Sequence, residues 1–172
     1  MNKLRIYLKV FLIFSIFLVA SCDNIFQSKP EDVLSEYLQA DLVGDNEKAY
    51  TYLSSKDKKN KSLQQYISEK SKHSDSELAK LFIDKTSHKI VNVEVNGNTA
   101  NIKVDTTTVD LEIITREFTN AAFKAATTGK SFDDIQNDIV EKYKKQDLPL
   151  NTYKSNHKLI KKGNEWKVVL NL

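Results

Sequence analysis

The sequence predicts an α+β domain in which N-terminal helices pack on one side of a curved antiparallel sheet. Apolar residues recur at helical spacing before residue 86 and again between residues 110 and 146, whereas they alternate with polar residues on either side of two turns that contain Gly and Asn. The four glycines and two prolines fall where these patterns change. We therefore expect helices, a β-hairpin, a two-helix insertion and a second β-hairpin, in that order.

The first helix is expected over residues 30–43, because Ser28 and Glu31 form a capping-box pattern ahead of apolar residues at helical spacing. Asp45 can cap a second short helix, so that the two helices form a bent pair. Residues 54–61, where lysines surround an aspartate, predict a solvated loop or the start of a helix. Shorter helical segments are expected around residues 63–67 and 76–82.

The first hairpin is expected to turn at Asn96-Gly97, because Asn and Gly supply the two positive-φ positions of a type I′ turn. The second is expected to turn at Gly163-Asn164 and to place Trp166 and every second residue after it on one buried face. The alternating apolar residues of the first hairpin are Val91, Val93 and Val95 before the turn and Ala100, Ile102 and Val104 after it.

Two helices are expected between the hairpins. Asp110 can cap the first, which ends at Gly129. Ser131 with Asp134 can cap the second, whose apolar stripe begins at Phe132. The insertion leaves the number of sheet strands open.

The N-terminal segment has the layout of a secretory signal. Lys3, Arg5 and Lys9 make a basic leader, and residues 10–20 are apolar apart from one serine. This run is shorter than the roughly 20 residues that a membrane-spanning helix needs. The segment therefore predicts a signal for export, followed directly by Cys22, the single cysteine of the chain.

Residues 19–22, Val-Ala-Ser-Cys, resemble the bacterial lipoprotein box. The resemblance implies that the Cys22 thiol carries a diacylglycerol, that the signal is cut before Cys22 and that the new amino terminus is often acylated too. Two or three acyl chains would hold the protein firmly on a membrane. Asp23 resembles the residue associated with retention in the inner membrane of enteric-type bacteria. An ordinary signal peptide with an incidental cysteine is the alternative.

These features divide the chain into a signal peptide (residues 1–21), a lipidated cysteine with a short tether (22–29) and a single α+β domain (30–172). Three of the 26 basic residues lie in the leader, which leaves 23 basic against 23 acidic residues. A balanced charge does not favour binding of nucleic acid, which requires a surplus of positive charge. A lone cysteine excludes an intramolecular disulfide.

Residues with an obvious chemical role are few. The sequence contains no phosphate-binding glycine loop, nucleophile elbow, zinc-protease helix or calcium loop. His73, His88 and His157 are scattered, and Asp133 and Asp134 are explained by the dipole of the helix that they begin. We therefore expect no cofactor, no metal ion and no catalytic residue.

Three segments resemble the nuclear transport factor 2-like fold, also called cystatin-like, as it occurs in small bacterial lipoproteins of unknown function: residues 33–38, residues 44–50 and residues 162–168. The resemblance implies a cone between helices and sheet, and a two-helix insertion occurs in some of these lipoproteins. Enzymes of the ketosteroid isomerase type place an Asp base and a Tyr donor in the cone mouth. The candidate cavity-lining residues here are Tyr37, Tyr50, Tyr153 and Trp166.

Two functions from different classes follow, with an isomerase-like enzyme behind both. In the first, side chains fill the cone, and the protein is a non-enzymatic accessory domain that binds another envelope protein through its inserted helices or an exposed sheet edge. In the second, the cone is hollow and carries a small apolar ligand. In both, the lipid holds the protein on the cell membrane, facing the periplasm or the exterior.

Overall fold

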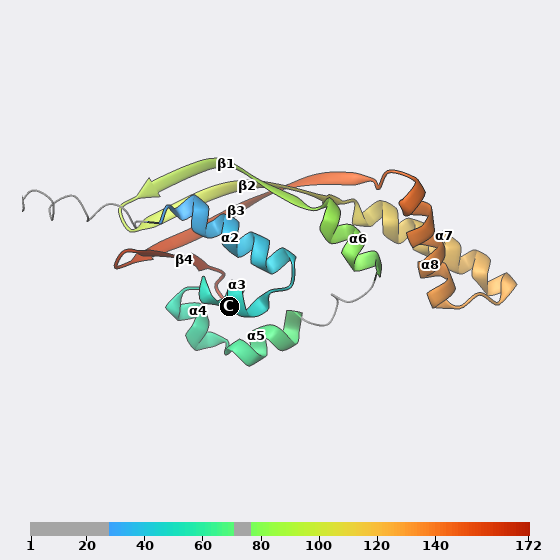
Figure 1. The fold of residues 1–172 in the computed structure, drawn as a ribbon, viewed down its shortest axis with the longest axis horizontal. Helices are drawn as coiled ribbons and strands as arrows, with labels where there is room; N and C mark the ends of the chain where they lie inside the picture. The colour runs from blue at the N-terminus through green and yellow to red at the C-terminus, as the bar shows by residue number, and fades with distance from the viewer. Residues whose placement is uncertain (1–27, 71–76) are drawn as a thin grey trace, which may run out of the picture.

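The computed structural model of the protein describes residues 28–70 and 77–172, and Figure 1 shows how they are arranged. The chain runs through helices, then a hairpin, two helices and a second hairpin. The helices are α2 (Pro30–Leu42), α3 (Asn46–Thr51), α4 (Ser55–Asn60), α5 (Leu63–Lys70), α6 (Glu77–Lys85), α7 (Leu111–Thr128) and α8 (Phe132–Lys145), and the strands are β1 (Ser87–Asn96), β2 (Thr99–Val109), β3 (Leu150–Lys162) and β4 (Glu165–Val169).

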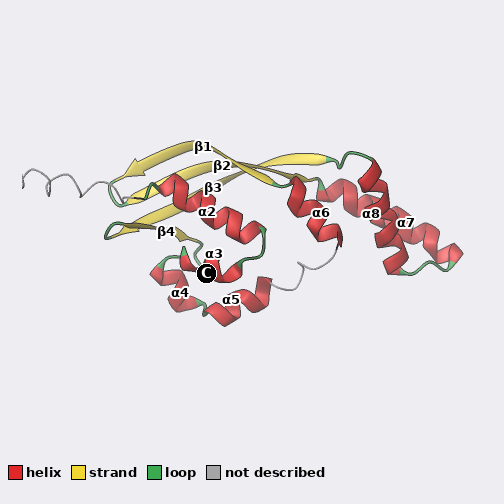
Figure 2. Cartoon of the chain, in the orientation of Figure 1, coloured by secondary structure: helices red, strands yellow, loops and turns green. Residues whose placement is uncertain are grey.

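The strands form one antiparallel sheet in the order β1-β2-β3-β4. Helix α2 packs on one face of this sheet, α3 packs against α2, and the α7–α8 pair extends beyond the far end of β2 (Figure 2). The predicted α+β class is therefore confirmed, together with both hairpins and the two-helix insertion between them.

The first hairpin differs from the prediction in its turn. Asn96 pairs with Thr99, so the two loop residues are Gly97 and Asn98. Gly97 has a φ of 58°, and Asn171 is the one non-glycine residue with positive φ in the described parts of the chain. A type I′ turn centred on Asn96-Gly97 is therefore wrong by one residue, and the glycine occupies the first central position that a type II′ turn assigns to it.

Strand β1 also contains a bulge that the alternating pattern concealed. The register with β2 shifts between Ile90 and Asn92. Ile90 and Val93 consequently pack against the core, whereas Val91 is 47% exposed. The expectation that Val91 and Val93 share a face is wrong, because one extra residue reverses the side-chain direction.

Three of the four predicted helix caps are confirmed. Asp45 accepts a hydrogen bond from the backbone N–H of Lys48 at the start of α3. Asp110 accepts hydrogen bonds at the start of α7 from the backbone of Glu112 and Ile113. At the start of α8, the Ser131 hydroxyl and the Asp134 carboxylate cap each other's backbone amides. The capping box predicted at Ser28 is wrong, because Lys29 is the N-cap of α2 and no side chain binds there. Pro30 at the first position suits this start without a cap.

Apolar side chains form two separate clusters. The first lies between α2, α3 and the sheet, where Leu34, Ile102, Leu159 and Val168 are each 0% exposed. The second joins α7 and α8 to the end of β2 and contains Val109, Ile114, Ala125, Ile135, Ile139, Tyr143 and Leu148. Burial of a large aliphatic side chain stabilises a fold by about 1.5–3 kcal/mol, so each cluster holds its own end of the molecule.

One carboxylate is fully buried. Asp57 lies on α4 at 0% exposure, so that the start of a helix expected in residues 54–61 is confirmed but a solvated segment is not. Its Oδ1 accepts from the backbone N–H of Leu172 at 2.9 Å, and its Oδ2 accepts from the N–H of Leu170 at 3.1 Å and from Ser54 Oγ at 2.5 Å. Burial alone would raise the pKa of Asp57, but these hydrogen bonds outweigh it and leave the pKa below its usual value.

We expect Asp57→Asn to lower the free energy of unfolding by about 3 kcal/mol, because the amide would point a donor at backbone N–H groups that are already donors. Asp84→Asn, at an exposed aspartate of α6, is the matched control and should change it by less than about 0.5 kcal/mol. Urea unfolding of both variants measures the difference. Equal stability of the two variants would contradict this role of Asp57.

The lowered pKa of Asp57 also predicts a dependence on pH. A carboxyl with a lower pKa in the folded than in the unfolded state, where it is about 3.9, stabilises the fold above that pH. This contribution is lost as the pH falls through the folded-state pKa. The stability difference between wild type and Asp57→Asn should therefore shrink in urea titrations carried out below about pH 4. A difference that stays constant down to pH 2 would refute the assignment.

Candidate functional site

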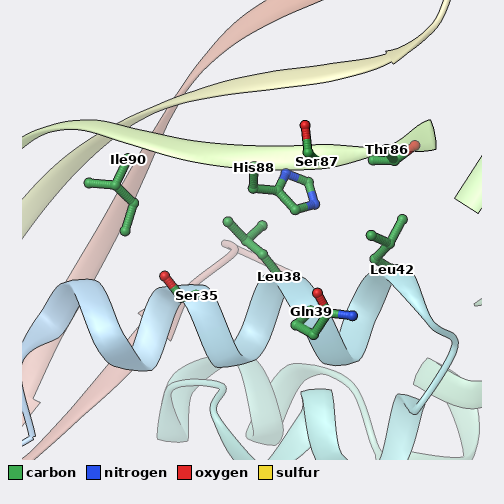
Figure 3. Close-up of a pocket in the computed structure, with 8 residues that line it drawn as sticks. All are labelled: Ser35, Leu38, Gln39, Leu42, Thr86, Ser87, His88 and Ile90. Atoms are coloured by element: carbon green, nitrogen blue, oxygen red, sulfur yellow. The ribbon is translucent and has the colours of Figure 1, made fainter. Parts of the chain in front are cut away.

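A groove of about 390 Å³ lies between α2 and the start of β1 (Figure 3). Its lining mixes apolar and polar side chains, and the imidazole of His88 points from the strand toward the helix. The groove is lined by Ser35, Leu38, Gln39 and Leu42 of α2, and by Thr86, Ser87, His88 and Ile90.

His88 is oriented by the neighbouring strand. It faces Thr106 across the β1–β2 ladder, and its Nδ1 lies 2.9 Å from Thr106 Oγ1. Burial lowers the pKa of His88 and outweighs the negative charge of Asp41, which would raise it. The ring is therefore neutral at pH 7. A neutral imidazole beside hydroxyl and amide groups can exchange hydrogen bonds with a small polar molecule.

His157 of β3 belongs to the same face of the sheet. Its Nε2 lies 2.9 Å from Ser155 Oγ, and burial lowers its pKa, as would a proton on His88. The two histidines are therefore held neutral by their surroundings. Within residues 28–70 and 77–172, no three His, Cys, Asp or Glu side chains are grouped as metal ligands would be.

Tyr37 and Tyr50, two of the predicted cavity residues, pack and form hydrogen bonds within the fold instead of lining a cavity. Tyr37 is buried in the first cluster, and burial, with the charge of Asp41, raises its pKa to about 12. The Tyr50 hydroxyl donates to Lys61 O at 2.8 Å, and its ring lies 5.6 Å from that of Tyr66. The Tyr66 hydroxyl donates to Asp41 Oδ1 at 3.2 Å. These tyrosines join α2, α3 and α5 to one another.

The other two predicted residues lie elsewhere. Trp166 of β4 is 5% exposed and belongs to the first cluster, whereas Tyr153 of β3 is 47% exposed. Tyr37, Tyr50 and Trp166 thus share one packed core, and Tyr153 stands apart from it. The α2–β1 groove contains none of the four. It does contain His88, for which the sequence predicted only a place on the surface or in the sheet.

The α7–α8 pair exposes large aromatic side chains. Phe123 is 74% exposed and Phe132 is 67% exposed. The ring of Phe132 stacks on that of Phe118 at a centroid distance of 6.0 Å, which leaves its outer face open. The prediction that Phe132 joins the buried stripe of α8 is wrong, because this residue begins the helix beyond the end of the second cluster.

Cys22 and Asp23, the predicted lipidation and sorting residues, lie outside the described residues. Among the helices that the structure does describe, none is long and apolar enough to cross a membrane.

Comparisons with known proteins concern the fold alone. No protein-family model matches the sequence. No curated protein matches it either. Among solved structures, a Campylobacter jejuni protein described as a "Putative NTF2-like transpeptidase" aligns with a TM-score of 0.45 and 18% sequence identity, over 84% of this chain and 100% of the other.

Proposed function

We propose that the protein is a non-enzymatic interaction domain of the bacterial envelope, held on the membrane by a lipid at Cys22 and binding another envelope protein through the α7–α8 pair. The observation that carries this proposal is the exposure of Phe123 and Phe132, at 74% and 67%. Exposed aromatic side chains are enriched where proteins bind one another.

The interior of the domain supports a role in binding partners rather than in catalysis. Side chains such as Leu34, Ile102 and Leu159 fill the space between α2 and the sheet at 0% exposure. Of the tyrosines expected as donors in an isomerase-like site, Tyr37 is buried in the first cluster and the Tyr50 hydroxyl donates to Lys61 O within the fold.

The positions of the two ends favour a protein partner over the lipid surface. Ser28 and Pro30 line a depression with Gly97, at one end of the sheet, whereas α7 follows β2 at the other end (Figure 1). The 11 residues of β2 between them span roughly 35 Å. A lipid at Cys22 would hold the near end at the membrane and leave the exposed aromatics at the far end.

Carriage of a small ligand stays the alternative. A ligand would have to use the α2–β1 groove rather than the filled interior, and the Ser35 hydroxyl, the Gln39 amide and His88 would suit an amphipathic molecule better than an apolar one (Figure 3). Native mass spectrometry of the purified chain would detect a bound molecule as stoichiometric extra mass.

The lipid anchor predicts the behaviour of Cys22→Ser. Without the thiol no diacylglycerol can be attached, so the protein should stay uncleaved or be released from the membrane. Fractionation of cells and intact-mass measurement distinguish these states from the anchored wild type. A variant that is cut before residue 22, carries no lipid and still stays firmly in the membrane fraction would contradict the anchor.

The aromatic surface predicts position-specific cross-linking. A photo-reactive phenylalanine analogue at Phe123 in intact cells should give a covalent adduct with a second protein, whereas the same analogue at the exposed Glu94 of β1 should give none. Adding Phe132→Ser should reduce the adduct about tenfold, as loss of one aromatic contact costs 1–2 kcal/mol. Adducts of equal yield at both positions, or no effect of Phe132→Ser, would count against the proposal.

A further inference from the structure

The first half of β3 is an open sheet edge. β3 pairs with β2 from Leu150 to Ile160, but β4 pairs with it only from Lys158 to Lys162. Within the described residues no strand lies on the β4 side of residues 150–157. Two large side chains are exposed along this edge, Leu150 at 49% and Tyr153 at 47%. We call the space beside residues 150–157 the open lane.

The C-terminal residues turn away from the sheet where the open lane begins. The β3–β4 register, in which Lys158 faces Val169, would place Asn171 opposite Asn156 if the ladder continued. Asn171 instead has a φ of 58°, which no extended strand adopts. The N–H groups of Leu170 and Leu172 bind the buried carboxylate of Asp57. The bonds to Asp57 thus hold the chain out of the lane.

The backbone groups that face the open lane can be assigned. Lys161 N donates to Asn98 O, on the β2 side of β3. Alternate residues of a strand direct their N–H and C=O groups to opposite neighbours, so Thr152, Lys154 and Asn156 direct theirs into the lane. In agreement, the N–H of Thr152 binds the side-chain oxygen of Asn151 at 2.8 Å instead of a strand.

We propose that the open lane binds an extended segment of a partner protein as an added strand, and that this segment alternates acidic with apolar residues. Its backbone would bond to Lys154 and Asn156. On the outer face its side chains would lie beside Lys154, with Lys158 further along the same face just beyond the lane, which favours carboxylates. On the inner face they would lie beside the exposed ring of Tyr153, which favours apolar residues.

The charge on this edge also disfavours a second copy of the chain as the occupant of the open lane. Pairing of two β3 edges would bring Lys154 of both copies onto the same outer face, where like charges destabilise a sheet. Lysine on an edge strand commonly prevents such self-pairing. The inference rests on the proposed function in that the added strand belongs to the protein that the α7–α8 pair binds.

The test uses the full chain in detergent and synthetic peptides of about ten residues, which is the length of a long strand. One peptide alternates Glu with Val, and its control alternates Lys with Val. Hydrogen exchange resolved by residue should show slower exchange at Lys154 and Asn156 with the Glu peptide, and no change at Ser155, whose N–H faces β2. Binding of the Glu peptide without protection of Lys154 and Asn156 would overturn the proposal. Protection that appears without peptide and rises with protein concentration would also overturn it, in favour of a second copy.

A pair of variants at Asn156 isolates the backbone contact. Asn156→Pro removes the N–H that faces the lane and leaves the bonds to β2, as proline is tolerated on the open side of an edge strand. Asn156→Ala keeps the N–H. The proline variant should bind the Glu peptide about tenfold more weakly than the alanine variant, with a similar melting temperature. Equal affinities would overturn the proposal.

If the proline variant does not fold, charge reversal at Lys154 tests whether the acidic peptide binds in the open lane. Lys154→Glu should weaken binding of the Glu peptide and strengthen that of the Lys peptide, whereas Lys145→Glu, at an exposed lysine of α8, should change neither. Equal responses of these two variants would overturn the proposal. Because the peptides are synthetic, this result is independent of the cross-linking at Phe123, so that either proposal can fail alone.

Discussion

The buried carboxylate of Asp57 is the contact on which the closure of the first half of the domain depends. Its partners Leu170 and Leu172 lie 113 and 115 positions further along the chain. Those hydrogen bonds join α4 to the end of the last strand, beside the point where Ser54 N binds Val168 O. A desolvated carboxylate is tolerated only when hydrogen bonds replace its water, so the helices and the C-terminal residues must be correctly placed together.

The same contact limits the sheet. Each N–H that Asp57 binds comes from a residue that leaves the line of β4, and the ladder with β3 ends at Val169. An open edge is a hazard for aggregation, and native proteins restrain such edges with charged side chains. Lys154 and Lys158 fit that restraint, and they leave the edge selective for an oppositely charged strand. The hydrogen bonds to Asp57 thus close the core and end the β3–β4 ladder at the same place.

The sequence predicted the helices and hairpins that depend on neighbouring residues. It did not predict the burial and strand register that depend on residues distant in the chain. Both hairpins and the α7–α8 pair follow from local spacing and local caps such as Ser131 with Asp134. The sequence indicated the start of a helix near Asp57 but not the burial of its carboxylate, because its amide partners are remote in sequence. The bulge at Val91 is set by pairing with β2, which an alternating pattern does not reveal. The sequence also does not show which tyrosines face a cavity, because that depends on packing between distant segments. For the same reason it did not indicate the α2–β1 groove around His88.

The exposed aromatics of the α7–α8 pair are not needed to hold that pair in place. The second cluster already packs Ile114, Ile135 and Ile139 against Val109 at the end of β2. Ion pairs add contacts between elements, with Lys142 to Glu117 at 2.6 Å and Lys144 to Glu77 of α6 at 2.7 Å, although exposed pairs contribute at most about 1 kcal/mol each. Apolar burial therefore fixes the pair relative to the sheet. Since Phe123 and Phe132 lie outside that buried set, their exposure is a property of a fixed surface, which is the condition for binding a partner with little loss of conformational entropy.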